Sequence, residues 1–325
     1  MLHTASIPQF RTLSGTTRDF ELTYRLFGPP LGSAPVVLVN HALTGNSQVS
    51  GDRGWWNALI GPDRVIDTKY FTVLAMDIPG NGHDGKSEHL IHNYKSFAVR
   101  DIALLQCKLL EQLEIKRLYA AIGGSLGGNL VWELAAIRPE LIEHIIPVAT
   151  DWKATDWLLA NCLIQDQLLN NSSRPIADAR MHAMTFYRTA ASFKKKFHRT
   201  INRELGIFNI ESWLLHHGRR LEERFQLASY KLMNHLLTTT DITQDGRSFE
   251  EVVAPITGTL HLVSVDTDQF FLANEIQHTY ETLKELAKPV TYHEIQSIHG
   301  HDAFLIEFDQ LNEALTPVFN PVLCP

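Results

Sequence analysis

The sequence predicts an α/β protein with a mostly parallel, doubly wound sheet and one helical insertion. Three observations support this prediction. Short apolar runs of strand length recur along the chain, helical patterns lie between several of them, and one long segment carries helical patterns alone. Such runs are typical of parallel strands buried on both faces and joined by right-handed crossovers. They cover residues 36–39, 71–78, 118–122, 145–149, 259–265 and 290–295.

Local patterns predict the elements at the start of the chain. Residues 6–27 read as two β segments around the turn Ser14-Gly15-Thr16, because residues 20–24 alternate between apolar and polar side chains. Residues 97–113 predict an amphipathic helix, since apolar residues recur there at steps of three and four.

The helical insertion is predicted from a segment without convincing strands, in which helical patterns cover residues 152–169 and 211–237. We therefore expect a core built from residues 1–150 and 241–325, with a helical lid at residues 151–240. Open α/β sheets bind ligands at their carboxyl edge, so a lid over that edge would shape a substrate pocket.

Composition argues against several classes of protein. The chain has 325 residues, 44% hydrophobic and 20% charged, as in ordinary globular proteins. Its formal net charge of -7 argues against nucleic acid or an anionic membrane as the main partner. No apolar run approaches the roughly 18 residues of a membrane span, and the first residues lack the pattern of a secretory signal. We expect a cytoplasmic protein that binds neither membranes nor nucleic acid.

The most specific local signal is the sequence GGSLGG at residues 123–128. It follows an apolar run and precedes a helical pattern, which is the strand–turn–helix context of a G-x-S-x-G nucleophile elbow. Glycines are needed there because the backbone of the nucleophile is strained and neighbouring side chains would collide. Ser125 is therefore the candidate nucleophile, and a glycine-rich structural turn is the alternative.

A serine hydroxyl becomes a nucleophile only when a base takes its proton and an acid orients that base. In elbow-containing folds the chain order is Ser, acid, His. Asp266 and Asp268 follow one predicted strand, and His299 and His301 follow the next, so two candidates exist for each role. A His-x-His pair could also bind a metal, but without a supporting cluster of carboxylates or cysteines we expect no metal site.

The sequence HALTG at residues 41–45 directly follows the strand predicted at 36–39. In elbow-containing folds such a loop supplies one backbone donor of the oxyanion hole, and the residue after the nucleophile supplies the other. We expect the N–H groups of Leu43 and Leu126 to face the oxyanion, each stabilising the transition state by about 3 kcal/mol. A plain turn of small residues is the alternative.

These motifs resemble those of the homoserine O-acetyltransferases, a family of the α/β-hydrolase superfamily. The resemblance covers residues from about 35 to 310 and implies an α/β-hydrolase fold with a helical lid. Besides the loop and the elbow it rests on further stretches in the same order: GWWNALIGP at 54–62 with IDT at 66–68, AR at 179–180 with TFYR at 185–188, ESWLLHHG at 211–218 with SY at 229–230, DQFF at 268–271 and GHDAFL at 300–305.

The resemblance implies which acid and base belong to the catalytic triad. The family's acid precedes an aromatic or Leu-Phe pair, which implies Asp268 and leaves Asp266 as the second choice. The family's base is the His of a Gly-His-Asp sequence, which implies His301 in preference to His299.

The resemblance also implies residues that bind the acceptor amino acid. Arg180 is implied to bind its carboxylate, for which a guanidinium group is well shaped, and Asp302 to hold its amino group. Thr44 and Tyr187 match further substrate contacts of the family.

The reaction implied by the resemblance is a ping-pong acyl transfer of methionine biosynthesis. Ser125 takes the acetyl group from acetyl-CoA, and His301 then activates the hydroxyl of L-homoserine to receive it. Acetyl-CoA is a co-substrate, and no cofactor is implied. Members of the family are typically dimeric through the lid, so we expect a homodimer.

Two departures from the family pattern leave alternatives open. The sequence IPGNGHDGKS at residues 78–87 replaces a characteristic glycine-rich stretch, and the segment between Ser125 and Arg180 is shorter than usual. Both changes affect the pocket and leave the triad intact. The acyl donor could be acetyl-CoA or succinyl-CoA, and the acceptor could be homoserine or another hydroxy amino acid. If water is the acceptor, the protein is a serine hydrolase of small esters.

Overall fold

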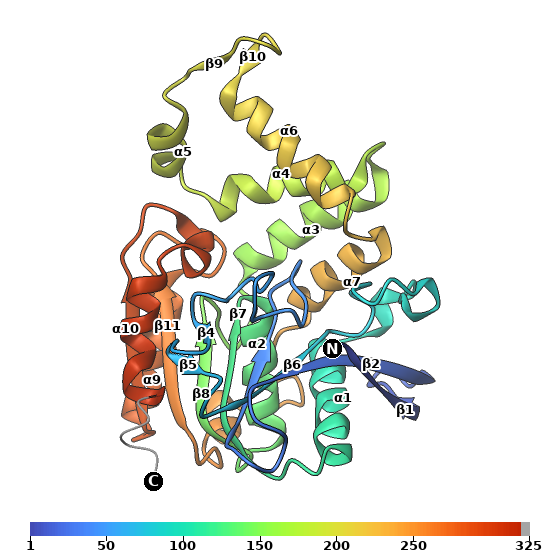
Figure 1. The fold of residues 1–325 in the computed structure, drawn as a ribbon, viewed down its shortest axis with the longest axis vertical. Helices are drawn as coiled ribbons and strands as arrows, with labels where there is room; N and C mark the ends of the chain where they lie inside the picture. Colours follow the sequence, from blue (N-terminus) through green and yellow to red (C-terminus); the bar gives the residue numbers. More distant parts are fainter. Residues whose placement is uncertain (320–325) are drawn as a thin grey trace.

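An eight-stranded sheet forms the centre of the computed structural model, which describes residues 1–319 (Figure 1). The strand order is β1-β2-β6-β3-β7-β8-β11-β12. Strand β2 pairs antiparallel with β1 and β6, whereas all neighbours from β6 to β12 are parallel, which confirms the predicted class. The strands are β1 (His3–Arg11), β2 (Thr17–Phe27), β3 (Val36–Asn40), β6 (Thr72–Met76), β7 (Leu118–Gly124), β8 (Ile142–Val148), β11 (Thr259–Val265) and β12 (Val290–Ile295).

The sheet is covered on both faces, which explains why its central strands are apolar throughout. Successive side chains of a strand point to opposite faces, so Leu38 joins one buried cluster while Val37 and Val39 join the other. Helices α1 (Val99–Gln112), α2 (Leu126–Ile137), α8 (Phe249–Val253) and α9 (Ala273–Glu285) contribute to the first cluster. Helix α10 (Phe308–Phe319) and the segment with β4 (Ile60–Gly61) and β5 (Ile66–Asp67) contribute to the second.

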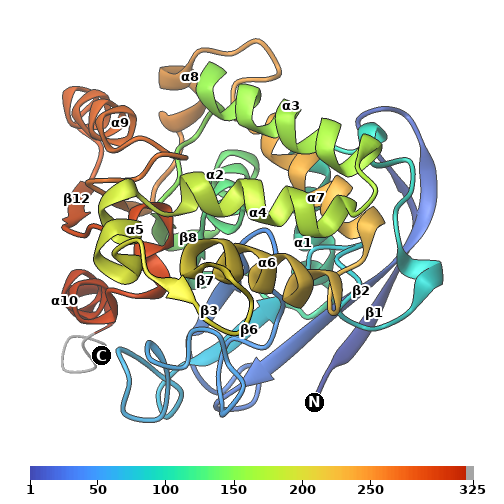
Figure 2. The same cartoon turned by 90° about the horizontal axis from the view of Figure 1, so that it is seen from above.

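Five helices form a lid over the carboxyl edge of the sheet, as Figure 1 shows from the side and Figure 2 from above. They lie between β8 and β11, which are neighbours in the sheet. The lid is therefore one insertion between adjacent strands. Its helices are α3 (Asp156–Asn171), α4 (Pro175–Tyr187), α5 (Ala190–Phe197), α6 (Asn209–Glu222) and α7 (Leu227–Thr238).

The lid differs from its predicted pattern in two places. The helical pattern at 211–237 is two helices, α6 and α7, because the chain turns between them and buries Phe225 against Tyr230, with ring centroids 6.1 Å apart. The expectation that the lid holds no strand is wrong, since β9 (Ile201–Asn202) and β10 (Ile207–Phe208) form a small hairpin. Two-residue strands are too short to give a detectable alternation of side chains.

Three 3-10 helices complete the described elements: η1 (Ser87–His89), η2 (Tyr94–Ser96) and η3 (Gly300–Leu305). None of the helices in residues 1–319 is both long and apolar enough to cross a membrane.

Candidate active site

Ser125 lies in the turn between β7 and α2 with a positive φ of 55° and a ψ of -125°. A side-chain-bearing residue rarely adopts such a backbone, so tight surroundings must hold it there. A β-carbon on Gly127 would lie 2.3 Å from the Asn40 carbonyl oxygen, and one on Gly128 would lie 2.2 Å from the Thr150 methyl group. The glycines of the motif are therefore required by close packing around the turn, which presents Ser125 at the carboxyl edge of the sheet.

Ser125, His301 and Asp268 form a continuous hydrogen-bonded relay. The Ser125 Oγ lies 2.9 Å from His301 Nε2, and His301 Nδ1 lies 2.7 Å from Asp268 Oδ2. The other carboxylate oxygen, Asp268 Oδ1, accepts hydrogen bonds from the backbone N–H groups of Phe270 and Phe271, at 2.7 and 3.0 Å. The carboxylate is thereby fixed so that it accepts a hydrogen bond from Nδ1–H of His301 and leaves Nε2 free to accept the serine proton.

The other candidate acid and base lie outside this relay. Asp266 Oδ1 accepts a hydrogen bond from the backbone N–H of Ser297, at 2.9 Å. His299 Nδ1 lies 2.9 Å from Ser192 Oγ and 3.2 Å from Arg188 Nη1. Of the two pairs that the sequence leaves open, the structure brings Asp268 and His301 to Ser125.

Aromatic rings surround the His301 imidazole. The ring centroids of Phe270, Tyr187, Phe304 and Phe271 lie 5.2, 5.5, 5.5 and 5.7 Å from that of the imidazole. His301 is consequently only 4% exposed. An apolar enclosure limits the access of water to the base and strengthens its polar contacts with serine and aspartate.

The two expected backbone donors of the oxyanion hole are free. Leu126 is the first residue of α2, where N–H groups have no partner within the helix. Leu43 lies in the loop after β3. Within residues 1–319, neither of these N–H groups donates to an acceptor. Both remain available for an oxyanion, and the positive end of the α2 dipole favours a negative charge beside Leu126.

The loop that carries Leu43 is anchored by two buried residues that sequence reasoning did not single out. His41 Nε2 accepts a hydrogen bond from the backbone N–H of Ile78 at 2.9 Å, and burial lowers the pKa of His41 so that it stays neutral. Asp77 accepts hydrogen bonds from the backbone N–H and the hydroxyl of Ser47, at 2.7 and 2.8 Å. The signal for His41 was available, because it opens the HALTG sequence.

Arg180 is half-buried on α4, with its guanidinium carbon 5.7 Å from the centroid of the Tyr187 ring. No carboxylate within residues 1–319 forms an ion pair with it. Burial is the main reason that the pKa of Tyr187 lies well above its usual range, so its hydroxyl stays protonated. The lid therefore presents an unpaired cation and a phenol close to the triad histidine.

Asp302 already has a partner, and Thr44 contacts the lid through its backbone. The carboxylate of Asp302 accepts a hydrogen bond from Arg188 Nε at 2.8 Å, a pairing that the sequence did not reveal. An amino group bound there would share Asp302 with Arg188. The Thr44 carbonyl accepts a hydrogen bond from Arg224 Nη1 at 3.1 Å, which ties the lid to the oxyanion loop.

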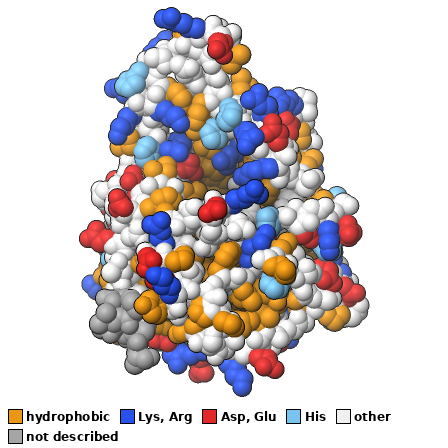
Figure 3. All heavy atoms as spheres, viewed as in Figure 1, with side chains coloured by type: hydrophobic (Ala, Val, Ile, Leu, Met, Phe, Trp, Pro, Cys, Tyr) orange, Lys and Arg blue, Asp and Glu red, His pale blue; other side chains and the backbone are white. Residues whose placement is uncertain are grey.

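Positive charge gathers where the lid faces the site. Burial lowers the pKa of Arg224, and the neighbouring charges of Arg180 and Arg220 lower it further. Burial, followed by Arg180, lowers the pKa of His217 to about 4. His217 is half-buried, with its ring centroid 4.1 Å from that of Trp213. Figure 3 shows Lys, Arg and His side chains around a hollow with a hydrophobic floor between lid and core.

A metal has no evident place in the described part of the chain. Within residues 1–319, no three or more His, Cys, Asp and Glu side chains are grouped so that they could hold a metal ion.

Comparisons with known proteins define first the class and then the family. A family profile described as "alpha/beta hydrolase fold" matches residues 35–200. The homoserine O-acetyltransferase of Moorella thermoacetica is 30% identical over 317 residues, which cover 86% of this chain and 85% of the relative. The chain thus has the α/β-hydrolase fold. It belongs to the homoserine O-acetyltransferase family.

Solved structures share this fold over nearly the whole chain. The homoserine O-acetyltransferase from Bacillus anthracis has a TM-score of 0.89 at 19% identity, covering 98% of this chain and 97% of its own. Esterase E22 has a TM-score of 0.85 at 18% identity, covering 98% of this chain and 100% of its own. The same architecture therefore carries proteins named as transferases and as esterases, and the residues of the pocket must distinguish them.

Proposed function

We propose that the protein transfers the acetyl group of acetyl-CoA to the hydroxyl of L-homoserine in methionine biosynthesis. The observation that carries the proposal is Arg180, a half-buried guanidinium without a carboxylate partner beside the triad, in a chain of this family. A hydrolase needs the triad and the oxyanion hole but has no use for an unpaired cation there. The carboxylate of an amino-acid acceptor would neutralise Arg180.

In the first half-reaction Ser125 is the nucleophile and His301 the general base. Asp268 orients His301 and stabilises its protonated form. The Ser125 oxygen attacks the thioester carbonyl, and the N–H groups of Leu43 and Leu126 stabilise the resulting oxyanion. When the carbon–sulfur bond breaks, His301 returns the proton to the sulfur, CoA leaves, and the acetyl group stays as an ester on Ser125.

In the second half-reaction the hydroxyl of homoserine takes the place of water. Arg180 binds its carboxylate, and Asp302, held by Arg188, attracts its amino group. His301 removes the hydroxyl proton as the oxygen attacks the acetyl-enzyme, and the same oxyanion hole serves again. Thr44 and Tyr187 line the acceptor's position. The collapse of the intermediate returns the proton to Ser125 and releases O-acetylhomoserine.

Hydrolysis of small esters is the second candidate function. The observation that favours it is the ion pair of Asp302 with Arg188, because this pair occupies the carboxylate assigned to the acceptor's amino group. Without that contact an amino acid would be held by Arg180 alone and would compete less well with water. The triad would act in the same way, with water as the second nucleophile.

The test mixes the purified protein with acetyl-CoA, follows CoA release, and then adds L-homoserine. A burst equal to the enzyme concentration, followed by homoserine-dependent turnover, is the expected result. Fast CoA release that homoserine does not change would contradict the proposal that homoserine is the acceptor, and it would favour the hydrolase. Release of CoA from succinyl-CoA and not from acetyl-CoA would contradict the proposal that acetyl-CoA is the donor.

We further propose that the protein acts in the cytoplasm as a homodimer. Helix α3 supports the assembly, because several large apolar side chains on it are exposed, as expected of an interaction surface. Sedimentation at several concentrations tests it, and a monomer at micromolar concentration would contradict it. The exposed side chains are Trp157, Leu159, Leu163 and Ile164.

A further inference from the structure

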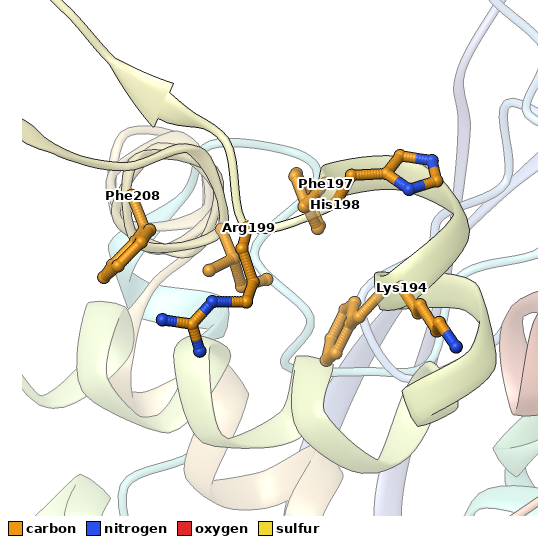
Figure 4. Close-up of a pocket in the computed structure, with 7 residues that line it drawn as sticks. Lys194, Phe197, His198, Arg199 and Phe208 are labelled. Carbon is orange, nitrogen blue, oxygen red and sulfur yellow. The ribbon is translucent and has the colours of Figure 1, made fainter.

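A groove of about 570 Å³ lies on the lid between α5 and the β9–β10 hairpin (Figure 4). Aromatic and aliphatic side chains form its wall, and cations stand at its rim. Figure 4 shows Arg199 and Phe208 on one side of it and Lys194, on α5, on the other. The groove thus combines flat apolar surfaces with positive charge. Its lining residues are Phe193, Lys194, Phe197, His198, Arg199, Phe208 and Ile210.

The charge at this groove is opposite to that of the whole chain. Residues 179–203 hold seven Lys and Arg and no Asp or Glu, whereas the chain has a formal net charge of -7. Lys194 and Arg199 are exposed, and within residues 1–319 neither forms an ion pair with a carboxylate. Arg199 lies over the Phe208 ring, 5.5 Å from its centroid. Phe208 is 37% exposed, whereas Phe197 is only 7% exposed and packs against Trp213. Unpaired cations beside one exposed aromatic ring suit a ligand that carries both an aromatic base and phosphates.

The groove begins beside a segment that contacts the loop before His301. Thr189, just before α5, donates a hydrogen bond to the Ile298 carbonyl, and Ser192 Oγ lies 2.9 Å from His299 Nδ1. Phe193, the next residue, already lines the groove. An eight-residue helix is about 12 Å long, so α5 leads from the loop of His301 along the groove within the reach of an extended ligand arm.

We propose that this groove binds the 3′-phospho-ADP end of the CoA donor. The adenine ring packs against Phe208, and the phosphates pair with Lys194 and Arg199, while the pantetheine arm runs along α5 towards Ser125. The inference rests on the proposed function for the identity of the donor. It adds where the donor's nucleotide is held, a contact that a hydrolase of small neutral esters does not need.

Direct binding of adenosine 3′,5′-bisphosphate, measured by calorimetry at low salt, tests the groove without any turnover. The Lys194→Ala/Arg199→Ala variant should bind at least about tenfold more weakly than the wild type, and added salt should weaken wild-type binding. The matched control is Lys116→Ala/Arg117→Ala, which removes two exposed charges at the amino end of β7, on the opposite edge of the sheet. The control should bind like the wild type.

Kinetics with two donors give a second readout. In the groove variant the KM for acetyl-CoA should rise about tenfold at unchanged kcat, whereas the KM for acetyl-pantetheine, which lacks the nucleotide, should not change. An equal rise for both donors would overturn the proposal, as would equal binding of the bisphosphate by both double variants or no binding by the wild type.

The groove could instead be covered by a second copy of the chain. If Phe208→Ala changes the mass measured by sedimentation and leaves nucleotide binding intact, the groove is an interface and the proposal is wrong. Failure of the proposed function looks different. Suppose that the wild type binds the bisphosphate through the groove but transfers no acetyl group to homoserine. The proposed nucleotide site would then stand, and homoserine would be excluded as the acceptor.

Discussion

The core and the lid contribute to one site in opposite ways. The core supplies groups that are buried and fully hydrogen-bonded, such as Ser125, Asp268 and His301, each at most 5% exposed. The lid supplies Arg180, which is half-buried and has no carboxylate partner in the described residues. The core is therefore preorganised for the chemistry, whereas the lid is incomplete until a substrate carries the missing negative charge.

The largest expected effect comes from removing the nucleophile held by the core. Ser125→Ala should lower kcat at least about 10⁴-fold, because the relay has no other group to form the acyl-enzyme. The measurement is steady-state turnover together with labelling by a serine-reactive phosphonate, which should mark only the wild type. A melting temperature like that of the wild type is the control. Labelling of the variant would mean that another serine is the nucleophile.

The matched pair Asp268→Asn and Asp266→Asn separates the two candidate acids. Asp268→Asn should lower kcat about 10³- to 10⁴-fold, because an amide facing Nδ1 stabilises the wrong tautomer of His301. Asp266→Asn should stay within about threefold of the wild type, since Asp266 accepts only a backbone hydrogen bond from Ser297. The reverse order of the two variants would exclude Asp268 as the acid.

Asp151 tests the junction at which the chain leaves β8 for the lid. Burial raises the pKa of Asp151 to about 7. Hydrogen bonds from Trp152 and Thr279 act in the opposite direction, but their effect is smaller. A carboxyl whose pKa is higher in the folded state stabilises the fold below its unfolded pKa, and this stability is lost as pH rises towards 7. The free energy of unfolding of Asp151→Asn, relative to that of the wild type, should therefore increase by about 3 kcal/mol as the pH rises from about 4 to about 8.

Denaturant unfolding across that pH range measures the difference for Asp151→Asn. His261 acts with the opposite sign in both proteins, because burial lowers its pKa to about 4 and its contribution is lost as pH falls. The comparison between variant and wild type cancels that contribution. Parallel stability curves would show that Asp151 is ionised in the folded protein.

The smallest effect is expected in the lid, and it should be selective. Arg180→Ala should raise the KM for homoserine about 10- to 100-fold, the cost of about 1.5–3 kcal/mol for a lost charge-assisted hydrogen bond. Hydrolysis of a small neutral ester should stay within about twofold, because that substrate carries no carboxylate. Arg174→Ala is the control, since Arg174 is the N-cap residue of the same helix, α4, but is exposed and paired with Glu222. Equal loss of both activities would make Arg180 a structural residue.

The sequence predicted most of the core because its signals are local. Six of the strands follow from continuous apolar runs, and the elbow follows from glycines whose spacing reflects packing around Ser125. The choice between His299 and His301 could not be made from periodicity, because both lie in one short loop. The family resemblance and the structure select the same residue, His301.

The lid was less predictable because its contacts join residues far apart in the sequence. Neither the pairing of Arg188 with Asp302 nor the contact of Arg224 with Thr44 leaves a pattern in either segment alone. Net charge was also misleading, since the value of -7 averages an acidic core with the acid-free residues 179–203. A local charge count would have revealed the basic groove.

The lid begins after β8 and ends before β11, and these two strands are paired side by side in the sheet. Lengthening, trimming or exchanging the inserted helices therefore leaves the strand order and the reacting groups where they are. Descendants of one ancestral gene can change their substrates by changing the inserted lid alone while they inherit the same catalytic residues of the core. For protein engineering, the segment between these two strands is the natural unit to graft from one member of the superfamily onto another.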